Sequence, residues 1–288
     1  MAARGPEAAF DAERAWSLLL DQTALGPRFP GSPGHAALRE WLRGELAGHV
    51  DEVLLQDFTY VDPQAGELAL TNVIGVQGRE RPRKLLLAAH WDTRPRADND
   101  PDFARRETPI LGANDGASGV AVLLEIARVL RARPPRVGIV YAFFDGEDWG
   151  FPAPPPTWPP GSVLLGSCYF AEHIVPERPA WGILLDMVGR RNLTLQPEGI
   201  SLAAAPHLVN RVWSAGRELG HHLFLPQPGL QVLDDHLPLI RAGIPMVNLV
   251  DQAFPQWHTT ADTPEQCDPR TLGAVGETVL RTIYGEPE

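Results

Sequence analysis

The stretch Lys84-Leu85-Leu86-Leu87-Ala88-Ala89-His90-Trp91-Asp92 decides the fold, because a short apolar run there ends abruptly in polar residues. Three further runs, residues 137–144, 181–185 and 246–250, have the same continuous apolar character. Continuous rather than alternating apolar strands are typical of a sheet covered on both faces. We therefore predict an α/β protein with a mixed, mostly parallel twisted central sheet flanked by helices on both faces.

Helical periodicity and turn residues predict the remaining elements. Apolar residues at helical spacing predict helices over 10–21, 116–130, 207–219 and 271–284, and Ser32-Pro33 should begin another that reaches about residue 47. Residues 53–55 and 67–76 predict a hairpin of strands that turns between Asp62 and Gly66. The Pro-rich segment 150–162 is either a surface linker or a site-forming loop. We predict one domain over residues 1–288.

Composition excludes several classes of protein. The chain has 25 basic and 36 acidic residues, a net charge of −11, which argues against a surface for nucleic acid or anionic membranes. Two cysteines, Cys168 and Cys267, are too few for a disulfide scaffold. Lys84 is the single lysine and precedes a strand, which excludes lysine-nucleophile chemistry.

The chain contains no apolar run of the roughly 20 residues needed to cross a bilayer. Its first residues lack the apolar core of a signal peptide. We expect a cytoplasmic protein, or a periplasmic or secreted one if a signal peptide has been removed. We also expect a monomer, because no long apolar surface stripe is visible.

Polar residues follow each predicted strand at the edge where sites form in sheets of this kind. His90 and Asp92 follow the first run, Asp145-Gly146-Glu147-Asp148 the second and Asp186 the third, while Trp257-His258 comes soon after the fourth; Asp115 precedes the helix at 116. Each has an ordinary explanation alone, such as a helix cap for Asp115 or a solvated turn for Glu147 and Asp148. Together, two imidazoles and several carboxylates predict a Zn²⁺ site, and the lack of nearby thiolates indicates a catalytic one.

The spacing of these residues suggests different roles for them. Glu147 and Asp148 are adjacent, so one should bind the metal while its neighbour acts as a general base. Asp92, two residues after His90, suits a carboxylate that fixes an imidazole tautomer. Glu198 and Glu218 are interpreted as solvated surface charges.

The pattern His90-x-Asp92, Asp115, Glu147-Asp148, Asp186 and His258 resembles the zinc aminopeptidase superfamily, and the similarity runs from Pro30 to the last helix. Three features resemble its glutaminyl-peptide cyclotransferase branch, the glutaminyl cyclases: Asp234-Asp235-His236, Phe254-Pro255, and Trp257 directly before His258. The Asp-Gly-Glu-Asp-Trp-Gly stretch at 145–150 with its Pro-rich loop resembles the bacterial members. The resemblance implies a zinc-dependent exopeptidase fold, of the phosphorylase/hydrolase-like type.

The resemblance also implies roles for individual residues. Asp115, Asp148 and His258 would hold one catalytic zinc, Glu147 would be the proton shuttle, Asp186 and Asp234 would form an acidic network around the substrate amine, and Trp257, Phe254 and either Trp149 or Trp158 would line the substrate pocket. Two positions depart from the animal cyclases, which carry Glu in place of Asp148 and His in place of Asn248.

The implied activity is that of a zinc-dependent acyltransferase that converts the N-terminal glutamine of peptides or proteins to pyroglutamate and ammonia. A two-zinc metalloaminopeptidase is the alternative, with His90, Asp92 and Asp186 at or around a second metal. A non-catalytic binding domain on the same fold is a third possibility, but it predicts lost ligands, whereas every position is filled here.

Overall fold

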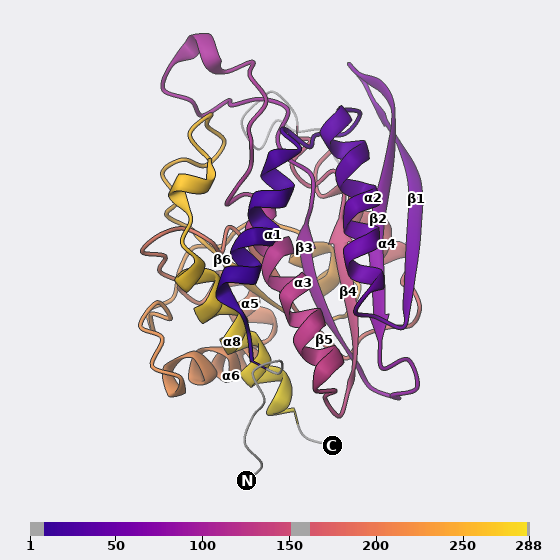
Figure 1. The fold of residues 1–288 in the computed structure, drawn as a ribbon, viewed down its shortest axis with the longest axis vertical. Helices are drawn as coiled ribbons and strands as arrows, with labels where there is room; N and C mark the ends of the chain where they lie inside the picture. Colours follow the sequence, from indigo (N-terminus) through magenta and orange to yellow (C-terminus); the bar gives the residue numbers. More distant parts are fainter. Residues whose placement is uncertain (1–8, 151–161, 287–288) are drawn as a thin grey trace.

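The computed structural model describes residues 9–150 and 162–286. Six strands form one sheet in the order β1-β2-β4-β3-β5-β6 (Figure 1). The strands are β1 (Glu52–Asp62), β2 (Gly66–Gln77), β3 (Lys84–His90), β4 (Gly138–Phe144), β5 (Trp181–Asp186) and β6 (Met246–Val250). The β4-β3-β5-β6 half is parallel, whereas β1 and β2 add to it as an antiparallel hairpin. The predicted mixed, mostly parallel sheet is therefore confirmed.

Helices cover both faces of the sheet. In chain order they are α1 (Ala12–Ala24), α2 (Pro33–Ala47), α3 (Ala117–Ala132), α4 (Leu165–Glu172), α5 (Gly199–Ala204), α6 (Pro206–Glu218), α7 (His236–Arg241) and α8 (Pro269–Tyr284), with short 3-10 turns η2 (Phe103–Arg105) and η3 (Pro264–Gln266). Residues of α1, α2, α3, α6 and α8 share one apolar core with one face of the sheet, and Figure 1 shows α1, α2 and α3 in front of it. Residues of α4 and α7 pack on the opposite face.

Local sequence explains where these elements begin and turn. The Ser32 side chain accepts a hydrogen bond from the His35 amide at the start of α2, the expected cap. Asp62 accepts from the amides of Gln64 and Ala65 and so closes the β1–β2 hairpin. Every residue of β3, β4, β5 and β6 is buried, as continuous apolar runs predict.

The two shortest helices, α5 and α7, have no counterpart in the predicted elements. Each is six residues long, too short for a 3.6-residue apolar period to stand out. No helix in the described ranges is long and apolar enough to cross a membrane.

Candidate active site

Most of the polar residues that follow the strands line one small cavity at the carboxyl ends of β3, β4 and β5. The cavity has a volume of about 80 Å³. Its lining includes Arg94, Asp115, Glu147, Asp148, Asp186, Met187, Val232, Leu233, Asp234, Trp257 and His258. The side chains that the sequence predicts to gather at the strand ends therefore lie close together at this edge of the sheet.

His90, the last residue of β3, is buried between two carboxylates. Its Nε2 atom lies 3.2 Å from Asp115 Oδ1 and 3.2 Å from Asp186 Oδ1. Gly116, with φ +95°, lets Asp115 approach, because a Cβ at this glycine would lie 3.1 Å from His90 Cε1.

His258 faces the same aspartate from the other side. Its Nε2 atom lies 3.0 Å from Asp148 Oδ1 and 3.7 Å from Asp115 Oδ2. Burial alone would raise the pKa of Asp148, but the charge and hydrogen bond of His258 outweigh it and lower that pKa to about 2. Asp115 thus lies between two imidazoles.

The imidazoles and carboxylates grouped around Asp115 fit a zinc ion. One ligand atom from each of His90, Asp115 and Asp148 can lie within 4.8 Å of the other two. The Asp115 Oδ2 and Asp148 Oδ2 atoms are buried and have no hydrogen-bond partner among the described residues. Because unpaired buried carboxylate oxygens are costly, a cation between them would remove that cost. Imidazole nitrogen and carboxylate oxygen are zinc ligands.

Glu147 lies beside these donors. Its side chain is 18 % exposed, and its Oε2 atom lies 3.9 Å from His90 Nδ1. Burial, together with the negative charges of Asp148, Asp235 and Asp234, raises the pKa of Glu147 well above its ordinary value. A carboxyl group with a raised pKa is suited to both taking up and releasing a proton.

The side chain of Asp92 contacts the backbone of Glu147 and Asp148. Its two carboxylate oxygens accept hydrogen bonds from the Glu147 and Asp148 amides, both at 3.1 Å. Its Oδ1 atom lies 3.7 Å from His90 Nδ1, beyond hydrogen-bond reach, so the predicted link to the imidazole is replaced by one to the turn after β4.

Asp186 and Asp234 supply further negative charge. Burial and the charges of Asp234 and Asp115 raise the pKa of Asp186 well above its ordinary value. The Asp234 carboxylate accepts hydrogen bonds from the Asp235 amide and from Asn248 Nδ2, both at 2.6 Å. The two aspartates therefore form an acidic wall suited to a cationic group.

The aromatic residues are only partly where the sequence placed them. Trp257 lines the cavity, is 46 % exposed and lies against the His258 ring at a centroid distance of 4.1 Å. Phe254, predicted to line the substrate pocket, is instead buried in an apolar cluster with Val250 and the lining residue Met187. Trp149, the other predicted pocket residue in the described ranges, also lies elsewhere. Its indole N–H donates to Asp62, and its ring packs on an apolar cluster under the β1–β2 hairpin. Trp158 lies outside the described residues.

Sequence reasoning missed residues that hold the site together. Asp262, four residues after His258, accepts hydrogen bonds from the Asn114 and Asp115 amides at 2.8 and 3.0 Å. Arg28 is fully buried and donates to the carbonyls of Leu111 and Gly112, just before Asp115. The position of Asp262, four residues after His258, is a feature of the sequence that could have identified it as part of the site. No local pattern identifies Arg28, because it lies in a loop far from the other site residues in sequence.

Glu198 is a further correction. The sequence predicts a solvated surface charge at this position, but the exposed fraction of Glu198 is 0 %. It caps α5 and is paired with His236.

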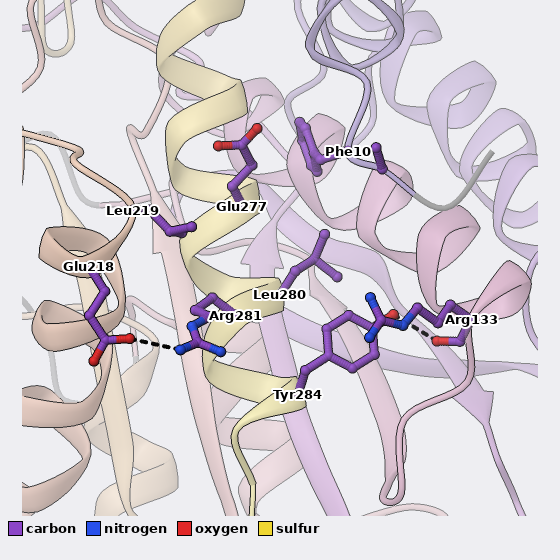
Figure 2. Close-up of a pocket in the computed structure, with 9 residues that line it drawn as sticks. Phe10, Arg133, Glu218, Leu219, Glu277, Leu280, Arg281 and Tyr284 are labelled. Carbon is purple, nitrogen blue, oxygen red and sulfur yellow. Dashed lines mark hydrogen bonds and ion pairs between the residues drawn. The ribbon is translucent and has the colours of Figure 1, made fainter. Parts of the chain in front are cut away.

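A larger hollow lies elsewhere, between α6, α8 and the start of α1. Figure 2 shows its lining, where Arg281 pairs with Glu218 and the Arg133 guanidinium lies over the Tyr284 ring. Its lining residues contain no imidazole or thiolate, and none of the candidate metal ligands. We therefore assign no catalysis to it.

Comparisons with known proteins agree with this geometry. The model of peptidase family M28 matches residues 72–283. A glutaminyl-peptide cyclotransferase-like protein of Mus musculus is 30 % identical, with 91 % of this chain and 72 % of that protein covered. The crystal structure of Tannerella forsythia glutaminyl cyclase is 40 % identical, covers 97 % of this chain and 100 % of that one, and gives a TM-score of 0.93.

A Zn-dependent exopeptidase from Parabacteroides distasonis is similar to the same degree, at 38 % identity, 97 % and 100 % coverage and a TM-score of 0.93. The family model spans well over half of the chain, and relatives of both descriptions share nearly its whole length. The chain therefore belongs to peptidase family M28, within the group that contains the glutaminyl-peptide cyclotransferases.

Proposed function

We propose that this protein is a zinc-dependent glutaminyl-peptide cyclotransferase, which converts an N-terminal glutamine to pyroglutamate and releases ammonia. The observation that carries the proposal is the grouping of three features in one small cavity. These are the donor set around Asp115, the Glu147 carboxyl with its raised pKa, and the acidic wall of Asp186 and Asp234. The names of two of the relatives above, the glutaminyl-peptide cyclotransferase-like protein and the Tannerella forsythia glutaminyl cyclase, support the same activity.

The acidic wall would bind and orient the substrate's α-amine. A positive amine between Asp186 and Asp234 would offset the repulsion that raises the pKa of Asp186. Holding the amine beside the γ-carbonyl carbon makes ring closure an intramolecular reaction, which lowers the entropic part of the barrier.

Glu147 would move the proton. Once the bound amine has lost a proton to water, its neutral α-nitrogen bonds to the side-chain carbonyl carbon (Cδ), and the Glu147 carboxylate takes a proton from that nitrogen. Glu147 returns this proton to the amide nitrogen, whose bond to Cδ breaks as ammonia leaves. Zinc held by Asp115, Asp148 and His258 would polarise the γ-carbonyl and stabilise negative charge on its oxygen. Trp257, half-exposed at the cavity, would cover the substrate and exclude water that could hydrolyse the amide.

The second candidate is a two-zinc aminopeptidase. His90, Asp115 and Asp186 form a second possible ligand set, since His90 Nε2 lies 3.2 Å from both carboxylates. In that reaction Glu147 would take its proton from an attacking water.

Two peptides that differ only in their first residue separate these functions. With a Gln-initiated peptide, we expect ammonia and an N-terminally blocked product of unchanged residue number. With the matched Leu-initiated peptide, we expect no free leucine. Release of leucine at a comparable rate, together with close to two zinc ions per chain, would establish the aminopeptidase instead.

A further inference from the structure

Glu198 gathers an unusual number of hydrogen bonds far from solvent. Its Oε1 atom accepts from the amides of Ile200 and Val232, at 2.7 and 2.9 Å. Its Oε2 atom accepts from the Ser201 amide and hydroxyl, at 2.7 and 2.8 Å. The same Oε2 lies 3.1 Å from His236 Nε2. The reaction proposed above gives none of these contacts a role.

The contacts of Glu198 hold both ends of one short segment of the cavity wall. Val232 begins the segment and His236 ends it, and Leu233 and Asp234 lie between them. Val232, Leu233 and Asp234 all line the cavity. A single buried carboxylate therefore fixes the wall that carries Asp234.

A second connection runs from His236 through a side chain. His236 has no exposed surface, and its Nδ1 atom lies 3.4 Å from Asn248 Nδ2. The same Nδ2 donates to Asp234 Oδ2 at 2.6 Å. The Asn248 amide must face Asp234 with its nitrogen, because its oxygen would repel the carboxylate.

We propose that Glu198, His236 and Asn248 form a buried positioning relay that orients the Asp234 carboxylate. Each link requires the next one. The Glu198 carboxylate accepts a hydrogen bond from His236 Nε2–H, so His236 Nδ1 is the acceptor. Asn248 then donates one amide hydrogen to His236 Nδ1 and the other to Asp234. The relay makes His236 a neutral imidazole with its proton on Nε2. Its effect on catalysis rests on the role proposed for Asp234.

Two substitutions of His236 test the relay. His236→Leu removes both the hydrogen-bond donor to Glu198 and the acceptor for Asn248. We therefore expect kcat for a Gln-initiated peptide to fall by about 10- to 100-fold, which is the usual effect of removing a residue that orients a functional side chain. His236→Gln restores a donor towards Glu198 and an acceptor towards Asn248, so we expect at least about a tenfold recovery over His236→Leu. Equal losses in the two variants, or unchanged kcat in His236→Leu, would overturn the proposal.

A surface pair provides the matched control. His221 Nε2 lies 2.9 Å from Glu277 Oε2, away from the cavity, so His221→Leu and His221→Gln remove and replace a similar His–Glu contact. We expect both to keep the wild-type kcat. A loss in His221→Leu as large as that in His236→Leu would overturn the proposal, because the effect would then not depend on the relay.

Nitrogen NMR of the unmodified zinc-loaded enzyme gives a readout that depends on neither activity nor folding of a variant. We expect His236 to carry its proton on Nε2 alone at neutral pH. A proton on Nδ1, or on both nitrogens, would overturn the relay. If the wild-type enzyme releases no ammonia from Gln-initiated peptides, the proposed function fails, whereas the tautomer still decides the relay.

Discussion

His258 Nε2 lies 3.0 Å from Asp148 Oδ1, although 110 positions separate the two residues in the chain. Both side chains are nearly fully buried, and Asp115 lies within 3.7 Å of the same imidazole nitrogen. This contact joins the turn after β4 to the loop after β6, and the two together form one side of the proposed zinc site.

Replacing His258 should therefore weaken zinc binding. We expect His258→Ala to lower the zinc affinity by more than about 100-fold. Loss of a residue that only hydrogen-bonds to a metal ligand costs up to about 100-fold, and here a proposed ligand itself is removed. Competition with a chelator measures the affinity. The exposed His207→Ala is the control. Wild-type zinc affinity in His258→Ala would show that the ion is held elsewhere, such as by His90, Asp115 and Asp186.

Asp262 should support the same site indirectly. Its carboxylate accepts from the Asn114 and Asp115 amides, and an asparagine has only one oxygen for these two donors. We expect Asp262→Asn to weaken zinc binding by about 10- to 100-fold and to lower the unfolding free energy by about 1–3 kcal/mol.

Asp268→Asn is the matched control for Asp262→Asn. Asp268 caps α8 away from the cavity, and asparagine caps helices about as well as aspartate. We expect its zinc affinity to equal that of the wild type. If Asp262→Asn binds zinc as tightly as this control, Asp262 does not position Asp115.

Trp257 should contribute mainly to substrate binding. Its ring lies on the His258 imidazole but is 46 % exposed, so it can contact a ligand without being part of the core. We expect Trp257→Ala to raise KM for a Gln-initiated peptide by about tenfold, the equivalent of about 1.4 kcal/mol, and Trp257→Phe to raise it less. Steady-state kinetics measure both. An unchanged KM in Trp257→Ala would remove this residue from the pocket.

Glu198 should make stability depend on pH. Burial opposes its charge, but hydrogen bonds from His236 and three backbone amides outweigh burial and lower the pKa of Glu198 from 4.5 to about 2. A lowered carboxyl pKa stabilises the folded state above pH 4.5, and this contribution is lost as the pH falls towards 2. The shift corresponds to about 3 kcal/mol.

Urea denaturation between pH 6 and pH 3 measures this dependence. We expect the stability difference between the wild type and Glu198→Gln to be largest at pH 6 and to shrink below about pH 4.5. Glu218→Gln, a change at an exposed glutamate, should show no such trend. A difference that is constant over this range would mean that the pKa of Glu198 is not lowered.

Much of the fold and the grouping of the candidate site residues could be predicted from sequence because both follow from local patterns. The runs that became β3, β4, β5 and β6 are mostly apolar, and parallel strands place their carboxyl ends at one edge. His90, Asp115, Glu147, Asp148, Asp186 and His258 could therefore be grouped without coordinates.

The errors concern residues whose environment depends on distant parts of the chain. The hydrogen bonds of Glu198 to Val232 and His236 span 34 and 38 positions, so no local pattern distinguishes it from a surface glutamate. Phe254 and Trp149 are aromatic residues close in sequence to residues of the site. An apolar side chain can be buried in the core next to a cavity as readily as it can line that cavity. Which of these occurs depends on neighbours such as Met187 and Leu70.

The most direct measurement is ammonia release from a Gln-initiated peptide by the wild type and by Glu147→Gln, with zinc content determined on the same samples. We expect stoichiometric ammonia and a blocked peptide from the wild type. We expect Glu147→Gln to bind zinc normally but to have lost turnover, since an amide cannot carry the proton. Near-native ammonia release by a zinc-loaded Glu147→Gln would show that Glu147 does not move the proton.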